Sequence, residues 1–95
     1  MNSIVDILNF LRSILEAPFP LRAELVKVFQ NAIWNDESIL DEDLNEILSE
    51  LAYDLDFYEP NEEWKKESIN YYGNDHLNEL LKQGIEQIES YINAL

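Results

Sequence analysis

The chain has 95 residues, of which 20 are Asp or Glu and 6 are Lys or Arg, so its formal net charge is −14. This length allows one domain with one core. A hydrophobic share of 46%, with four Phe, five Tyr and two Trp, excludes intrinsic disorder, and the absence of cysteine excludes disulfides, thiol nucleophiles and thiolate metal sites.

The first predicted helix covers residues 4–15. Its apolar residues recur every three or four positions, as one face of a helix requires: Ile4, Ile7, Leu8, Leu11, Ile14 and Leu15. Ser3 followed by Asp6 resembles a capping box at the start, and Pro18 ends the helix.

A second helix is predicted from Pro20 to about Trp34. Proline is well suited to the first position of a helix, because the N–H group that it lacks would have no partner there. The apolar series predicts which residues face the core: Leu21, Leu25, Val28, Phe29, Ala32 and Ile33.

The third helix is predicted over residues 41–56, with Asp41 as its N-cap. The apolar series that leads into it and continues along it is Leu40, Leu44, Ile47, Leu48, Leu51, Ala52 and Leu55. An aromatic segment that contains Pro60 follows, without helical periodicity. The last helix begins near a cap at Asn74 and carries Leu77, Leu80, Leu81, Ile85, Ile88 and Ile92, with Gly84 inside it.

These elements predict an all-α, single-domain protein over residues 1–95. We expect an antiparallel four-helix bundle with an irregular aromatic connector between the third and last helices. The N-terminal residues lack the basic start and apolar run of a signal peptide, and no apolar stretch is long enough to span a membrane. We therefore expect a cytoplasmic protein that does not bind membranes.

The negative charge is concentrated in the middle of the chain. Residues 36–67 contain 13 carboxylates and only two lysines, for a charge of −11, whereas residues 1–35 sum to zero and residues 68–95 to −3. Such a directed field raises association rates with basic proteins and repels nucleic acid and anionic membranes. The alternative is that the charge only keeps the protein dispersed.

Four carboxylates of the third helix recur at every fourth residue: Glu42, Glu46, Glu50 and Asp54. Glu42, Glu46 and Glu50 lie opposite the Leu44 face of the helix, and Asp54 continues the four-residue step. Neighbouring members are about 6 Å apart along the axis, and each like-charged pair destabilises the helix by about 0.2–0.5 kcal/mol. Because the spacing is shorter than the screening length of about 8 Å, the row acts as one extended negative potential. The pattern favours mimicry of a nucleic-acid backbone as a hypothesis.

The segment from Glu50 to Asn61, together with Trp64 and Tyr71-Tyr72-Gly73, resembles the signature of small bacterial immunity proteins of the colicin D immunity family. The resemblance covers about a quarter of the chain. It implies a four-helix protein that binds the nuclease domain of a bacteriocin or contact-dependent inhibition toxin and covers its active site. Members of the family often neutralise ribonucleases that cleave tRNA, by placing carboxylates where the RNA backbone would lie.

We expect the carboxylates in and directly after this segment to contact the partner, in addition to those of the third helix. They are Asp54, Asp56, Glu59, Glu62 and Glu63. Tyr58 is left open between an interface anchor and a core residue. We expect Tyr53, Leu55 and Trp64 to be packing residues that close the core over the connector.

Catalysis is not expected, because the chain has no thiol and His76 is its only histidine. We expect no cofactor, no metal and no direct contact with nucleic acid, and a monomer or a weak homodimer. One alternative is an acidic adaptor or DNA mimic that inhibits a DNA-binding protein. A remote alternative is an acyl-carrier-like protein modified at Ser38, although the residues around this serine depart from the carrier pattern.

Overall fold

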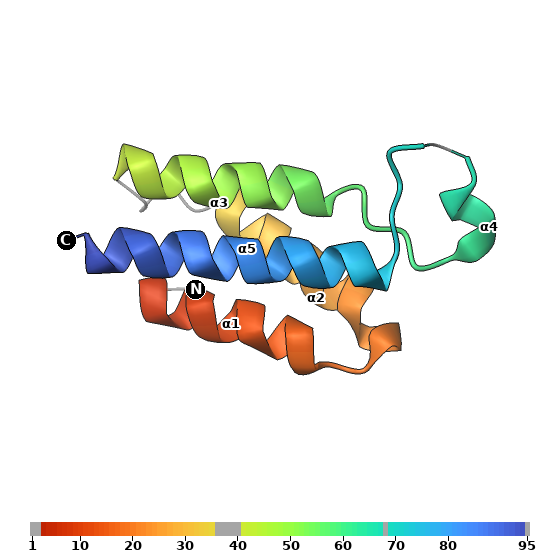
Figure 1. The fold of residues 1–95 in the computed structure, drawn as a ribbon, viewed down its shortest axis with the longest axis horizontal. Coiled ribbons are helices and arrows are strands. Elements are labelled where there is room, and N and C mark those ends of the chain that lie inside the picture. Colours follow the sequence, from red (N-terminus) through yellow and green to blue (C-terminus); the bar gives the residue numbers. More distant parts are fainter. Residues whose placement is uncertain (1–2, 36–40, 68, 95) are drawn as a thin grey trace.

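The described residues form five helices (Figure 1). The structure, a computed structural model, describes residues 3–35, 41–67 and 69–94. In chain order the helices are α1 (Ile4–Glu16), α2 (Phe19–Trp34), α3 (Glu42–Leu55), α4 (Glu62–Lys65) and α5 (Asn74–Asn93). The described residues contain no strand, only an isolated bridge between Tyr58 and Tyr72. The all-α class is therefore confirmed.

Each of the four long helices packs against two others: α1 and α3 both contact α2 and α5. Figure 1 shows α5 between α1 and α3 and running in the opposite direction to both. The molecule measures 43 × 23 × 19 Å along its principal axes. The connector between α3 and α5 was expected to be irregular, but it contains the short helix α4. Asn61 caps this helix by accepting hydrogen bonds from the N–H groups of Glu63 and Trp64.

Two of the predicted helix caps are present and one is not. Ser3 Oγ accepts a hydrogen bond from Asp6 N at 3.1 Å, and Asp41 Oδ1 accepts one from Leu44 N at 3.0 Å. The predicted cap at Asn74 is wrong: Gly73 is the N-cap of α5 and provides no side-chain bond. The Asn74 side chain instead bonds to other parts of the fold.

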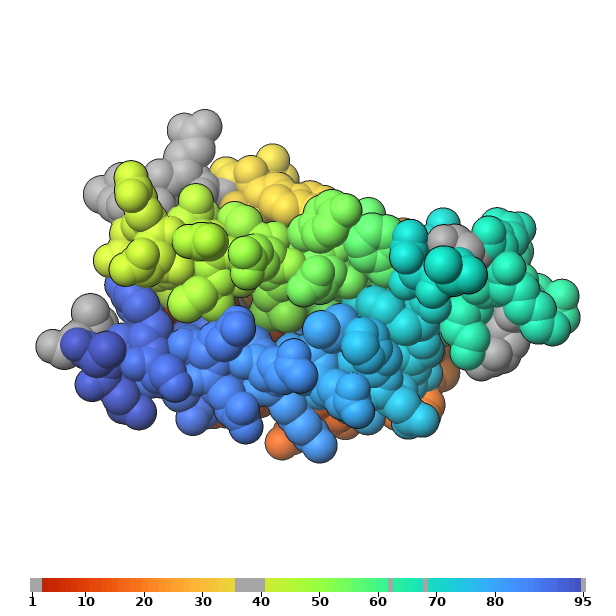
Figure 2. Space-filling model, turned by 45° about the horizontal axis from the view of Figure 1, so that its top comes forward, coloured from red at the N-terminus to blue at the C-terminus, as the bar shows by residue number. Residues whose placement is uncertain are grey.

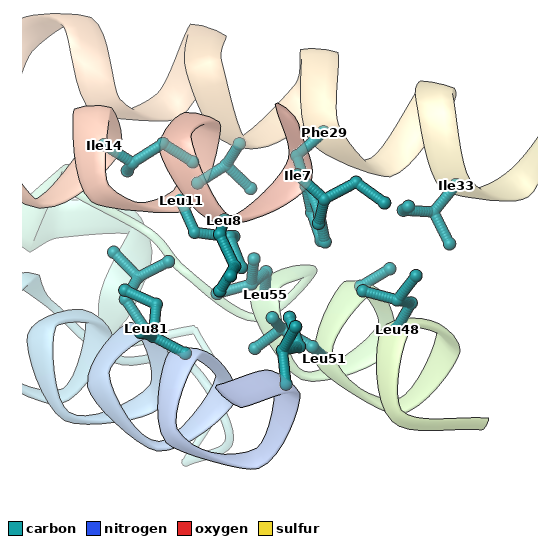
Figure 3. Packing of buried hydrophobic residues seen from close by; sticks show 14 of the residues in the cluster. Ile7, Leu8, Leu11, Ile14, Phe29, Ile33, Leu48, Leu51, Leu55 and Leu81 are labelled. Carbon is teal, nitrogen blue, oxygen red and sulfur yellow. The ribbon is translucent and has the colours of Figure 1, made fainter. Parts of the chain in front are cut away.

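The core forms where the apolar faces of α1, α2, α3 and α5 meet (Figure 3). The predicted periodicities of α1, α3 and α5 place their central residues correctly. The fully buried large side chains are Leu11, Ile14, Phe29, Leu48, Leu55, Leu77, Leu81 and Ile88.

The predicted core face of α2 is partly wrong. Leu21 and Val28 are about half exposed, whereas Arg22 and Gln30 are buried, with exposed fractions of 2% and 5%. Buried polar groups are tolerated where they are hydrogen-bonded. Gln30 Nε2 donates to the backbone oxygen of Ala52 at 3.0 Å and so ties α2 to α3. The apolar periodicity of one helix does not predict a hydrogen bond between a glutamine and the backbone of another helix.

The buried Arg22 joins three separate segments. Its NH2 group donates to the Leu15 backbone oxygen at 2.8 Å, at the end of α1, and its NH1 group donates to Asn74 Oδ1 at 3.3 Å, at the start of α5. The same Asn74 oxygen accepts the Tyr58 hydroxyl at 2.8 Å. The Asn74 side chain therefore links the connector to α2 and α5, which explains why it does not cap its own helix.

Candidate partner-binding site

The carboxylate row of α3 lies on the surface. Glu42, Glu46, Glu50 and Asp54 are all exposed, and Figure 2 shows α3 exposed along its length beside α5. None of the four forms a salt bridge in the described part of the chain, where the ion pairs join Arg12 to Glu89 and His76 to Glu79. Among the described residues, no cation therefore compensates the charge of the row. We call these four residues the α3 row.

The start of α3 suits negative charge. The helix begins with acidic residues beside its N-terminal N–H groups, where the helix dipole stabilises them. The hydrogen bond from the Leu44 N–H group lowers the pKa of Asp41 below its usual value, and a hydrogen bond with the Tyr91 side chain lowers it further. Asp41 therefore stays ionised at the start of α3.

Beyond α3, the other predicted contact residues lie along the connector. Asp56 is exposed, and its Oδ1 accepts a hydrogen bond from Gln30 Nε2 at 3.3 Å. Glu59 is half-buried, and its Oε1 accepts the Asn61 N–H group at 3.0 Å. Glu63 is exposed, and the Glu62 side chain lies outside what the structure describes. Beyond the α3 row, the carboxylates of the connector are therefore held separately and do not extend the regular spacing of the row.

Short backbone contacts hold the connector against the start of α5. Tyr72 N donates to the Phe57 oxygen at 3.1 Å, and Glu59 N donates to the Tyr72 oxygen at 2.9 Å. The Tyr72 hydroxyl donates to the Asp54 backbone oxygen at 2.6 Å. Burial raises the pKa of Tyr72 above its usual value, and the negative charge of Asp54 raises it further. The phenol thus remains a donor and fixes the end of α3.

The aromatic residues of the signature divide differently from the expectation. Leu55 is buried as predicted, but Tyr53 and Trp64 are 62% and 59% exposed, so their assignment to the core is wrong. Tyr58 is 8% exposed. Of the two roles left open for Tyr58, the structure therefore favours the core.

Tyr53 is the surface residue that sequence reasoning missed. It lies nine residues after Leu44, which is about two and a half turns, and so it projects from the same side of α3 as Glu46 and Glu50. Its ring contacts the Phe57 ring edge to face, with centroids 5.4 Å apart. The angle of 100° per residue that places the carboxylates also predicts an exposed Tyr53. The prediction was missed because aromatic residues were assumed to pack inward.

Trp64 borders a hollow of about 340 Å³ between α2, the connector and α4. Asp56 and Glu59 line this hollow together with the exposed Lys27. The cation lies at the edge of the acidic region and limits the negative potential on that side. The strongest uncompensated charge is therefore on α3.

The structure brings no metal-binding cluster together in the parts that it describes. No group of three His, Asp or Glu residues there is placed to hold a metal ion. His76 Nδ1 lies 3.5 Å from Glu79, and its ring stacks edge-on against Tyr72. None of the described helices is long and apolar enough to cross a membrane. Ser38, on which the carrier-protein alternative depends, lies outside the described residues.

Comparison of the chain with known protein families, with curated proteins and with solved structures finds no match. The resemblance to the colicin D immunity family therefore stays a prediction.

Proposed function

We propose that this protein is an immunity protein, which binds the basic nuclease domain of a toxin and covers its active site. The observation that carries the proposal is the exposed α3 row, which has no salt bridge among the described residues and has the exposed Tyr53 beside it on the same helix. Three repulsive pairs in one helix lower stability. A basic partner compensates this cost when it binds.

The remaining parts of the proposal follow from the same surface. Inhibition is steric and electrostatic, because carboxylates occupy positions that the phosphates of the toxin's substrate, in particular tRNA, would take. The protein has no activity of its own and does not bind nucleic acid. It acts in the cytoplasm as a monomer or weak homodimer, and α1, α2, α3 and α5 form an antiparallel four-helix bundle that holds the site rigid.

The test is protection of cells from the toxin encoded beside the gene. The C-terminal domain of the reading frame directly upstream is expressed with or without this protein, and survival and tRNA integrity are measured. Full protection by the wild type supports the proposal. Continued tRNA cleavage or cell death despite equal expression of both proteins contradicts it.

Matched charge variants locate the protective surface. A site variant carries Glu46→Lys, Glu50→Lys and Asp54→Lys, and a control variant carries Glu16→Lys, Glu24→Lys and Glu86→Lys at exposed positions on other helices. Both variants change the net charge by the same amount. We expect the site variant to lose protection and the control variant to keep it. Equal protection by the two would exclude the α3 row.

Capture of a DNA-binding protein, and not of a nuclease, would support the adaptor or DNA-mimic alternative. The same row of carboxylates favours that reading, since their regular spacing suits any cleft that accepts a nucleic-acid backbone. The identity of the bound protein decides between the two.

A further inference from the structure

We propose that the hollow beside Tyr53 is a subsite that accepts an arginine side chain of the protein partner. The hollow has a volume of about 460 Å³ and lies where the end of α3 and the connector meet the start of α5. Four residues with rings line it, Tyr53, Phe57, Tyr72 and His76, together with the acidic Asp54. The inference rests on the proposed function, and it names the chemical group that this part of the surface recognises.

The Tyr53 ring is exposed and oriented. Its edge-to-face contact with Phe57, at an interplanar angle of 79°, supports it from one side, and 62% of the residue remains accessible. A second hollow, lined by Ser49, Glu50, Tyr53 and Asp54, lies on the same stretch of α3. Tyr53 therefore stands between two concave regions, and each of them contains a carboxylate.

Asp54 is held in place by its backbone. The Tyr72 hydroxyl donates to the Asp54 carbonyl oxygen at 2.6 Å, which fixes the last turn of α3 against the start of α5. The Asp54 side chain is exposed and has no salt bridge among the described residues. The carboxylate is thus positioned beside the rings and available to a ligand.

The combination of rings and carboxylate selects a cation. An apolar side chain in the hollow would remove water from Asp54 without giving it a partner, and the charge of −11 on residues 36–67 repels an anion. A cation is attracted both to the face of a tyrosine ring and to a carboxylate. Arginine fits better than lysine, because its planar guanidinium stacks on a ring while its N–H groups bond to a carboxylate.

The test uses small amides and needs no knowledge of the partner. N-acetyl-arginine amide, N-acetyl-lysine amide and the neutral isostere N-acetyl-citrulline amide are titrated into the full chain, and the ring resonances of Tyr53 are followed by NMR. We expect the arginine amide to bind with saturable shifts centred on Tyr53, and the citrulline amide to bind about two- to fivefold more weakly or not at all. The lysine amide should lie between them.

Variants separate stacking from general electrostatic attraction. Tyr53→Leu and Asp54→Asn should each weaken arginine binding, whereas Tyr53→Phe should retain it. Trp34→Leu changes an equally exposed aromatic residue on α2 and should have no effect. Equal shifts with citrulline and arginine, or shifts spread evenly over all carboxylates, would overturn the subsite.

Failure of this inference and failure of the proposed function give different results. If the wild type protects cells but the arginine amide does not shift Tyr53, the subsite is wrong and the immunity function stands. If the amide binds at Tyr53 but the toxin domain is not neutralised, the subsite stands and its partner is another basic protein.

Discussion

Gly84 of α5 packs directly against Leu51 of α3. A Cβ atom placed on the glycine would lie 2.7 Å from Leu51 Cδ2, closer than Cβ atoms approach non-bonded neighbours in folded proteins. Both residues are buried, and Leu51 is only 5% exposed. The glycine therefore allows α3 and α5 to come together, which positions the outer face of α3.

Gly84→Ala should destabilise the protein although alanine favours a helix. Alanine gains about 1 kcal/mol in helix propensity, but the added methyl group overpacks the core, at about 1–3 kcal/mol. We expect a net loss of about 1 kcal/mol in the free energy of unfolding, measured by urea denaturation. With Leu51→Ala in the background, the same substitution should cost less. A Gly84→Ala variant more stable than the wild type would show that Leu51 yields freely.

Asn74→Ala should be more damaging than its half-buried position suggests. The substitution removes the acceptor of both Arg22 and Tyr58 and leaves buried donors without partners, at about 1–3 kcal/mol. Asn9→Ala, at an exposed position of α1, provides the control and should change the free energy of unfolding by less than about 0.5 kcal/mol. Equal effects of the two substitutions would contradict the role of Asn74 as a link between segments.

Alkaline pH should destabilise the fold through Tyr72. Its pKa is raised in the folded protein, first by burial and then by Asp54. The neutral phenol is thus favoured by folding, and its contribution to stability is complete below the unfolded-state pKa of about 10. The contribution is lost as the pH rises through the folded pKa. Denaturation at increasing pH should show this loss, and Tyr72→Phe should flatten the curve. An unchanged slope would exclude Tyr72 as its source.

Glu50→Lys should stabilise the isolated protein. Lysine at this position faces Glu46 and Asp54, each four residues away, and so replaces two repulsive pairs by two attractive ones. We expect a gain of about 1 kcal/mol in the free energy of unfolding at low salt, decreasing as salt is added. Glu24→Lys, at an exposed position of α2, is the control for the same change of net charge outside the row. A destabilised Glu50→Lys variant would show that the row contributes to folding.

The sequence predicts the parts of this structure that depend on local periodicity. It places α1, α3 and α5 correctly, and it identifies the caps at Ser3 and Asp41, because caps and apolar faces involve neighbours within one or two turns. It also places the carboxylates of α3 on the outer face, since the geometry of one helix determines that relationship.

The sequence does not predict features that depend on distant residues. Arg22 can be buried because Leu15, on the preceding helix, and Asn74, 52 residues further along the chain, accept its hydrogen bonds. Asparagine is a common helix cap, but the Asn74 side chain instead accepts hydrogen bonds from Arg22 and Tyr58. Trp64 lies on the short helix α4 with its side chain exposed. The four residues of this helix are too few to show a periodic pattern in the sequence.

The rate of association with the nuclease domain encoded upstream tests the central claim most directly. Stopped-flow measurements over a range of salt concentrations compare the wild type with a site variant (Glu46→Gln, Glu50→Gln, Asp54→Asn) and a control variant (Glu16→Gln, Glu24→Gln, Glu86→Gln). We expect the wild type and the control to associate at up to about 10⁸–10⁹ M⁻¹s⁻¹ at low salt, with a steep decline as salt rises. The site variant should associate more slowly and with a shallow salt dependence. Identical, salt-independent rates for all three proteins would contradict the claim that the α3 row is a docking surface.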